Sequence, residues 1–280
     1  MRIAVTGASG FLGRHVLAEL ERHQVTVTAT GRKVPAGASS TAHWVELDIA
    51  RPPTRVYEFI GSPDVLLHLA WGGLPNYGSL HHFEAELPAQ YAFLSGLVRQ
   101  GLPALVAVGT CFEYGAQSGA LRADRETRPT NPYAFAKDCL RRGLQFLQRD
   151  TPFAFTWARL FYVYGEGQAP LSLFCQLRDA VQRGDKVFPM SGGEQLRDYL
   201  PVDEAAKRLV RLALDRADLG PVNVCSGMPI SVRRLVEGWI AAHGWRIELG
   251  LGLRPYSPFE PMAFWGVDTL GAATLSPLER

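Results

Sequence analysis

The chain has 280 residues, of which 47% are hydrophobic and 20% charged, and its net charge is +2. This is the composition of a globular protein, and the mild, scattered basic charge argues against a nucleic-acid partner. No apolar stretch approaches the roughly 18–20 residues that span a membrane, and the N-terminus lacks the apolar region of a signal peptide. Four widely spaced cysteines form no C-x-x-C pair. We therefore expect a cytoplasmic protein with unpaired thiols, no membrane partner and no metal site.

Short apolar runs alternate with helical patterns through the first part of the chain. Strands are predicted at residues 2–7, 25–30, 44–49, 64–71, 103–110 and from 153. Helices are predicted at residues 12–20, at about 82–99 and from 131. This alternation is typical of an α/β protein with a doubly wound parallel sheet.

The pattern loosens beyond Gly165. Helices are predicted near residues 173–183, 204–216 and 232–243, with short strands near Val187 and Val222. We expect a first domain over residues 1–165 and a small C-terminal lobe over 166–280, with some segments returning to the first domain. The tail from Leu251 is expected to wrap over the rest.

Three glycines lie between the first strand and the first helix. Gly7, Gly10 and Gly13 fit a G-x-x-G-x-x-G loop in the strand–helix context that a dinucleotide-binding loop needs. The first glycine permits a sharp turn, the second lets the backbone approach a pyrophosphate, and the third lets the helix pack closely on the sheet. A plain glycine turn is the alternative.

The end of the second strand bears on the choice between NAD and NADP. NAD sites usually place a carboxylate there, whereas NADP sites place a basic residue against the 2′-phosphate. This chain has Arg32 and Lys33 at that point, with no Asp or Glu, and Arg14 lies in the first helix. The pattern favours NADP(H) and leaves NAD(H) possible; solvated loop charges are the alternative.

A tyrosine and a lysine share one helical turn in the run "NPYAFAK". Asn131 and Pro132 suit a helix start, which places Tyr133 and Lys137 on one face. An ammonium beside a phenol lowers the pKa of the phenol, so we expect Tyr133 to exchange a proton with a carbonyl or alcohol oxygen. Thr110 ends a predicted strand at the same sheet edge. The alternatives are an exposed tyrosine on a lysine stem and a capping threonine.

Together these motifs resemble the extended short-chain dehydrogenase/reductase family, the NAD(P)-dependent epimerases, dehydratases and reductases of nucleotide sugars. The similarity covers nearly the whole chain, through "TGASGFLG", "ELDI", "DVLLHLAW", "GTCFEYG", "NPYAFAK" and "GGEQLRDYLPVDEAA". It implies a Rossmann-type sheet with a small substrate-binding lobe and a nucleotide-diphosphate sugar as substrate. It also implies a homodimer through the helices near Phe83–Arg99 and Tyr133–Gln148.

The resemblance assigns three sets of site residues. The catalytic set is Thr110, Tyr133 and Lys137. The cofactor set is Gly7, Ser9, Gly10, Phe11, Leu12, Gly13, Arg32, Asp48, Ile49, Leu69, Ala70, Tyr133 and Lys137. The substrate set is Trp71, Gly72, Thr110, Cys111, Phe112, Tyr162 and Arg197, the last holding the diphosphate. His68 is expected to be a hydrogen-bonded core histidine.

Two positions depart from the family pattern: Tyr162 and Glu86 stand where asparagine is usual. Several local runs look closest to reductases of dTDP-4-keto-6-deoxyhexoses. We therefore expect NAD(P)H to deliver hydride to C4 of the keto sugar while Tyr133 donates the proton. The alternatives are a nucleotide-sugar 4-epimerase that retains its NAD and, more remotely, a non-catalytic cofactor-binding protein.

Overall fold

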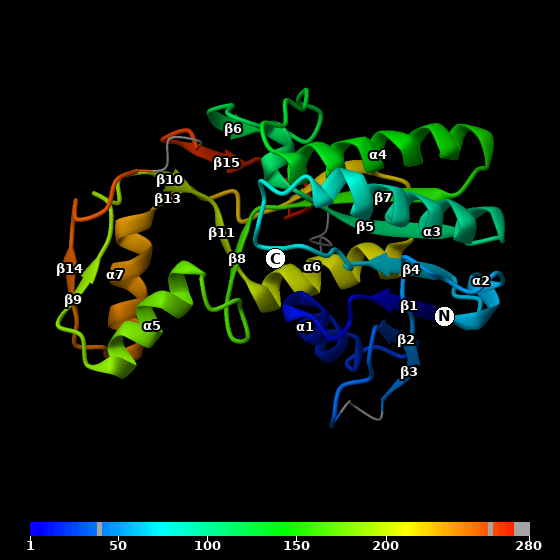
Figure 1. Cartoon of the computed structure of the whole chain (residues 1–280), viewed down its shortest axis with the longest axis horizontal. Coiled ribbons are helices and arrows are strands. Elements are labelled where there is room, and N and C mark those ends of the chain that lie inside the picture. The colour runs from blue at the N-terminus through cyan, green and yellow to red at the C-terminus, as the bar shows by residue number, and fades with distance from the viewer. Residues whose placement is uncertain (38–40, 257–259, 272–280) are drawn as a thin grey trace, which may run out of the picture.

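The computed structural model describes residues 1–37, 41–256 and 260–271. Within these ranges, seven parallel strands form one sheet in the order β12-β7-β5-β4-β1-β2-β3 (Figure 1). The strands are β1 (Arg2–Thr6), β2 (Thr26–Gly31), β3 (Ala42–Glu46), β4 (Val65–His68), β5 (Ala104–Thr110), β7 (Ala154–Leu160) and β12 (Gly220–Val224). This order is the doubly wound Rossmann arrangement, which confirms the predicted fold class.

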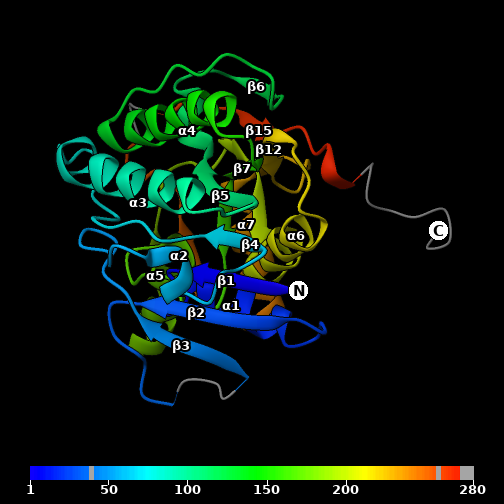
Figure 2. The same ribbon diagram turned by 90° about the vertical axis from the view of Figure 1, so that its right-hand side faces the viewer.

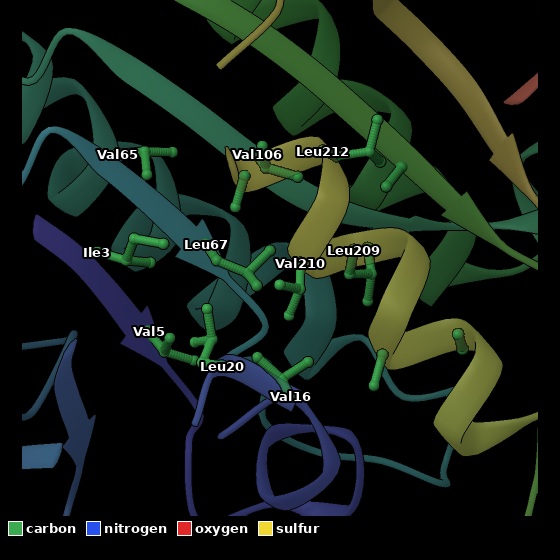
Figure 3. Packing of buried hydrophobic residues seen from close by; sticks show 14 of the residues in the cluster. Ile3, Val5, Val16, Leu20, Val65, Leu67, Val106, Leu209, Val210 and Leu212 are labelled. Atoms are coloured by element: carbon green, nitrogen blue, oxygen red, sulfur yellow. The ribbon is translucent and has the colours of Figure 1, made fainter. Parts of the chain in front are cut away.

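Helices cover both faces of the sheet, which explains its continuous apolar strands. One face carries α1 (Phe11–Leu20) and α6 (Val202–Asp215), and the other carries α2 (Val56–Phe59), α3 (Leu87–Arg99) and α4 (Pro132–Asp150) (Figure 2). Figure 3 shows the first face, where Val16 and Leu20 of α1 and Leu209 of α6 meet Val5 and Leu67 of the sheet. Both layers therefore hold the strand ends rigidly.

A smaller lobe lies beside the sheet (Figure 1, left) and has its own apolar core. It contains α5 (Leu173–Arg183), α7 (Val232–His243) and the strand pairs β9 (Val187–Pro189) with β14 (Glu248–Gly250) and β10 (Leu196–Arg197) with β13 (Ile230–Ser231). Trp239 of α7 packs against Tyr164, Phe174 and Tyr199. The lobe core thus reaches the strands that lead back to the large sheet.

Short elements join the two parts. β8 (Tyr162–Tyr164) pairs with β11 (Tyr199–Pro201), and β6 (Gly119–Leu121) pairs with β15 (Phe264–Gly266). A π-helical turn η1 (His82–Glu86) precedes α3, and a 3₁₀ turn η2 (Cys111–Tyr114) follows β5. None of the helices in the described ranges is long and apolar enough to cross a bilayer.

Most predicted elements are confirmed, and the differences have physical reasons. β4 ends at His68 rather than at Trp71, because residues 69–73 turn away from the sheet. The strand expected near Val222 is β12, an edge strand of the large sheet, and α6 packs on α1. The tail from Leu251 is predicted to wrap over the rest of the chain. Within it, β15 pairs with β6, whereas residues 257–259 and 272–280 lie outside the described residues.

Candidate functional site

The carboxyl ends of the central strands meet at one edge of the sheet. Thr6 at the end of β1 is in register with His68 at the end of β4, and β5 extends beyond this level to Thr110. The strand order reverses beside β1, which has β4 on one side and β2 on the other. Ligands of such sheets bind at this switch point, so the candidate site lies where the glycine loop leaves β1.

The glycine loop fits a dinucleotide pyrophosphate. Gly7 has a φ of +70°, and a Cβ there would lie 2.8 Å from the backbone nitrogen of Ala70. A Cβ on Gly13 would lie 2.3 Å from the carbonyl oxygen of Gly7. No side chain caps the N-terminus of α1, whose first turn carries no acidic residue. Its free N–H groups and positive dipole end therefore suit an anion.

Other residues predicted to contact the cofactor lie around this loop. Asp48 accepts hydrogen bonds from the Ala50 backbone at 3.0 Å and from Arg51 at 3.2 Å. Arg32 is exposed just after β2, whereas Arg14 reaches the carbonyl oxygen of Gly167 at 3.3 Å. The remaining predicted residues flank β1, α1, β3 and β4: Ser9, Gly10, Phe11, Leu12, Ile49, Leu69 and Ala70.

Tyr133 and Lys137 share one face of α4, as predicted, and this face is buried. The helix begins after Asn131, whose side chain accepts a hydrogen bond from the Ala134 backbone at 2.9 Å. The side chain of Lys137 donates to the carbonyl oxygen of Val108 at 2.8 Å and lies 4.0 Å from the Trp71 ring centroid. Both residues are less than a tenth exposed. This excludes the alternative interpretation, in which an exposed tyrosine stacks on the aliphatic part of the lysine.

The expected lowering of the Tyr133 pKa by Lys137 is wrong for this structure. Burial raises the pKa of Tyr133 well above its usual value, and a hydrogen bond to Thr110 opposes this only in part. Burial also lowers the pKa of Lys137 to about 7, while the Glu113 and Glu86 carboxylates raise it. The Lys137 ammonium lies 6.0 Å from the Tyr133 ring centroid. Desolvation therefore has a larger effect than this charge on the pKa of Tyr133, and it is also the largest effect on the pKa of Lys137. Tyr133 is therefore protonated at neutral pH, as a proton donor must be.

Thr110 caps the turn η2 and also contacts Tyr133. Its hydroxyl accepts from the Phe112 backbone at 3.3 Å, while the Thr110 backbone donates to Glu113 at 2.9 Å, forming a capping box. The Glu113 carboxylate is fully buried and pairs with Arg159 at 2.7 Å. Sequence reasoning missed this support, although "TCFE" carries the capping-box signal.

A buried polar network positions the loop after β4. The Trp71 indole donates to His82 at 3.1 Å, and Glu86 accepts from the Gly72 backbone at 3.0 Å. Gln90 donates to the same Glu86 carboxylate at 3.1 Å and lies 2.7 Å from His68. Glu86, one of the two departures from the family pattern, thus holds the backbone beside the predicted catalytic residues.

His68 is a hydrogen-bonded core histidine, as predicted. Its ring nitrogens lie 2.8 Å from the Thr6 hydroxyl and 2.7 Å from Gln90. Burial lowers the pKa of His68 to about 3, so the ring is neutral. Among the described residues, no cluster of three or more His, Cys, Asp or Glu side chains could hold a metal.

Three of the predicted substrate residues line two neighbouring hollows: Phe112, Tyr162 and Arg197. One, of about 670 Å³, opens beside Tyr133 and is lined by Tyr77, Phe112, Asn131, Phe264 and Glu260, among others. The other, of about 480 Å³, lies toward the small lobe and is lined by Tyr162, Arg197, Tyr199, Phe188, Arg254 and again Glu260, among others. Cys111 is buried beneath them. Trp71, Gly72 and Thr110 are not among the described residues that line either hollow, although Trp71 and Thr110 contact Tyr133.

Arg197 is already paired. Its guanidinium donates to Glu260 at 2.9 and 3.3 Å and stacks over Phe264, 4.7 Å from the ring centroid. The Tyr162 hydroxyl donates to the same Glu260 oxygen at 3.1 Å. Sequence reasoning missed Glu260, because it is 98 residues from Tyr162 and no local pattern marks it.

Comparison with known proteins identifies relatives over almost the whole chain. The model of the NAD dependent epimerase/dehydratase family matches residues 3–225. A dTDP-6-deoxy-L-talose 4-dehydrogenase (NAD(+)) from Aggregatibacter actinomycetemcomitans is 29% identical over 95% of this chain and 99% of its own length. A dTDP-6-deoxy-L-talose 4-dehydrogenase (NAD(P)(+)) from Kitasatospora kifunensis is 26% identical over 87% of this chain and 79% of its own.

Solved structures share the fold. MoeE5 in complex with UDP-glucuronic acid and NAD has a TM-score of 0.82 at 24% identity, covering 98% of this chain and 92% of its own. The NAD-dependent NDP-hexosamine 5,6-dehydratase TunA has a TM-score of 0.81 at 25% identity, covering 98% and 90%. These likenesses agree with the sheet order and the second lobe described above.

Proposed function

The chain belongs to the NAD dependent epimerase/dehydratase family, and on that premise we propose that it is a nucleotide-sugar 4-ketoreductase. Its substrate would be a dTDP-4-keto-6-deoxyhexose, reduced at C4 with NAD(P)H. The observation that carries this proposal is the end-to-end similarity to a dTDP-6-deoxy-L-talose 4-dehydrogenase, 29% over 95% of the chain. The buried Tyr133 beside Thr110 and Lys137 supplies the chemistry that the reaction needs.

Different residues of the chain would have different roles in such a reduction. A bound NAD(P)H would supply the hydride for the new C–H bond at C4. Tyr133, protonated at neutral pH, donates its proton to the C4 oxygen, and solvent later replaces that proton. The Thr110 hydroxyl, which contacts Tyr133, orients the same oxygen. Buried groups fixed in this way act by orientation and by stabilising the developing alkoxide.

Lys137 has a positioning role beside Tyr133. The Val108 carbonyl and the Trp71 ring hold its ammonium in place. Its pKa of about 7 makes its charge sensitive to pH in the working range. We assign to its ammonium a hydrogen bond with the ribose that a bound dinucleotide would place there.

We assign the loops of the sheet edge to the cofactor. Gly7, Gly10 and Gly13 would hold the pyrophosphate at the N-terminus of α1. Asp48 and Ile49 would lie along the adenine. Arg32, exposed after β2 where no carboxylate stands, supports NADP(H) over NAD(H), with Lys33 beside it.

The hollow beside Tyr133 suits the hexose. Its wall is mainly aromatic and apolar, through Tyr77, Phe112, Pro261 and Phe264, which favours a sugar with a methyl group at C6. The second hollow, with Phe188 and Arg254, suits the base and the diphosphate. Arg197 would contact the diphosphate after release from Glu260.

We also propose that the protein is a homodimer through α3 and α4. Phe83 and Phe135 form an edge-to-face pair at 6.4 Å and are 37% and 49% exposed. Phe146 on the same helix as Phe135 is 66% exposed. Apolar side chains so exposed on neighbouring helices favour a partner surface. Sedimentation equilibrium tests this: a monomer at micromolar concentration contradicts it.

The function is tested by nicotinamide absorbance after mixing the protein with a dTDP-4-keto-6-deoxyhexose and NADPH or NADH. We expect one cofactor oxidised per sugar reduced. Tyr133→Phe should lower kcat at least about 100-fold, because general acid catalysis contributes about that much, and should leave the cofactor Kd unchanged. Tyr57→Phe, whose hydroxyl donates to the Pro63 carbonyl at 3.3 Å, is the matched control. A fully active Tyr133→Phe enzyme overturns the proposal, and tightly retained NAD without cofactor consumption supports a 4-epimerase.

A further inference from the structure

One carboxylate, that of Glu260, lies on the wall shared by the two hollows of the candidate site. It lines the hollow beside Tyr133 together with Tyr77 and Phe112, and it lines the second hollow together with Arg197 and Tyr199. A ligand that spans both hollows must therefore pass this side chain. The Glu260 side chain is 32% exposed, so a ligand can reach it.

Glu260 is held through one of its two oxygens. Oε2 accepts from the Tyr162 hydroxyl at 3.1 Å and from two guanidinium nitrogens of Arg197 at 2.9 and 3.3 Å. Within the described part of the chain, no hydrogen bond reaches Oε1. An ionised carboxylate has acceptor capacity on both oxygens, so Oε1 is free to accept from a sugar hydroxyl.

The negative charge of Glu260 affects the pKa values of several groups on the hexose side of the site. Together with burial, it raises the pKa of Tyr77, Cys111 and Tyr162, which come from three separate segments. Cys111 directly follows Thr110, so this field extends to the catalytic edge of the sheet.

Among the described lining residues of the hexose hollow, no cation offsets this charge. The described residues that line it include no Lys, Arg or His, and Glu260 is their only charged side chain. When Arg197 contacts the diphosphate, as proposed above, it is released from Glu260, and Arg254 lines the other hollow. A second carboxylate placed there would meet a like charge and lose water without gaining a partner.

We propose that Glu260 is a specificity residue that admits neutral hexoses and rejects hexuronic acids, while its Oε1 accepts a hydrogen bond from a sugar hydroxyl. This inference rests on the proposed function in so far as the ligand is a nucleotide sugar. Nucleotide sugars occur with a methyl, a hydroxymethyl or a carboxylate at C6, and discrimination between them needs a repulsive element as well as a fitting pocket. Glu260 supplies that element through its charge.

The test compares two ligands that differ only at C6. Dissociation constants for dTDP-glucose and dTDP-glucuronic acid are measured by calorimetry at pH 7.5, with dTDP alone as reference and the UDP pair as a second series. The wild type should bind the neutral sugar at least tenfold more tightly than the uronic acid. Glu260→Gln, which keeps the shape and the acceptor, should reduce this ratio to threefold or less.

Two controls separate charge selection from other effects. Glu237→Gln removes an exposed carboxylate on α7 and should keep the wild-type ratio. Freeing Arg197 in Glu260→Gln changes the affinity for the diphosphate, and the dTDP reference measures this change in each variant. If Glu260→Gln fails to fold, Glu260→Ala and the wild-type ratio by itself still decide.

A wild-type ratio of threefold or less overturns the inference, and so does an undiminished ratio in Glu260→Gln. Absence of binding by all nucleotide sugars overturns both this inference and the proposed function. Discrimination at C6 without turnover of any 4-keto sugar supports the specificity role and contradicts only the reductase.

Discussion

The ammonium nitrogen of Lys137 lies over the indole of Trp71, 4.0 Å from the ring centroid. The indole is itself fixed by its hydrogen bond to His82, at 3.1 Å. This contact removes water from a charge that would otherwise be solvated, and burial lowers the pKa of Lys137 to about 7 from 10.5. Among the described residues, a carbonyl and an aromatic face directly replace the lost water, so burying this charge costs free energy of folding.

Lys137→Met should therefore stabilise the fold at neutral and low pH. Between pH 7 and 10.5 the unfolded chain binds more protons at this lysine than the folded chain, so wild-type stability gains with rising pH. Below pH 7 the lysine is charged in both states, so the full free-energy cost of burying its charge opposes folding. We expect Lys137→Met to gain about 2 kcal/mol there, after loss of the Val108 hydrogen bond, or about 4 °C in Tm.

Thermal unfolding at pH 6.5, 8 and 10.5 measures this. The advantage of the variant should shrink by about 1.4 kcal/mol per pH unit, vanish near about pH 8.5 and reverse by pH 10.5. Lys207→Met is the matched control, because Lys207 is exposed and paired with Glu204, so its difference from the wild type should be nearly independent of pH over this range. A Lys137→Met protein less stable than the wild type at pH 6.5 would contradict the assignment of burial as the dominant effect.

Glu113→Gln should destabilise the fold strongly. The substitution leaves Arg159, 1% exposed, without its carboxylate partner at 2.7 Å. Breaking a buried pair from one side costs about 3–5 kcal/mol. Urea unfolding checks this against Glu126→Gln, whose partner Arg128 is as exposed as itself and which should cost about 0.5 kcal/mol or less. A cost below about 1 kcal/mol for Glu113→Gln would mean that water or another group compensates Arg159.

The sequence predicted those parts of the site that depend on local chain geometry. The glycine loop, the Asn131 cap and the shared face of Tyr133 and Lys137 follow from spacing within a few residues, and the structure has each of them. The capping box at Thr110 also carries a local signal, which sequence reasoning did not use.

The features that sequence reasoning did not find depend on contacts between distant segments. The Lys137 pKa is set by burial under the loop after β4, and no spacing in "NPYAFAK" encodes that burial. Glu260 meets Tyr162 and Arg197 only because β15 returns to β6. The place of β12 in the sheet was missed because a short apolar run is compatible with either a lobe strand or a sheet strand.

Arg32 should select between the two nicotinamide cofactors. It is exposed directly after β2, and a 2′-phosphate there would gain a charge-assisted contact. Arg32→Ser should raise the Kd of NADPH about tenfold, since such a contact contributes about 1.5 kcal/mol, and should leave that of NADH within about twofold. Fluorescence titration measures both constants, with Arg211→Ser, an exposed arginine of α6, as control. Equal effects on the two cofactors would remove Arg32 from this role.

Gly13→Ala should abolish tight cofactor binding while leaving the sheet intact. The new Cβ would lie 2.3 Å from the Gly7 carbonyl oxygen and 2.7 Å from the Ala8 backbone, and neither atom belongs to a flexible side chain. The loop must shift, which costs about 1–3 kcal/mol of overpacking and displaces the N–H groups at the start of α1. Gly238→Ala in α7 is the matched control, because its Cβ meets no atom within 4 Å and a helical alanine stabilises by up to about 1 kcal/mol. Thermal unfolding and NADPH titration together decide: unchanged cofactor affinity in Gly13→Ala would show that the pyrophosphate does not bind at this loop.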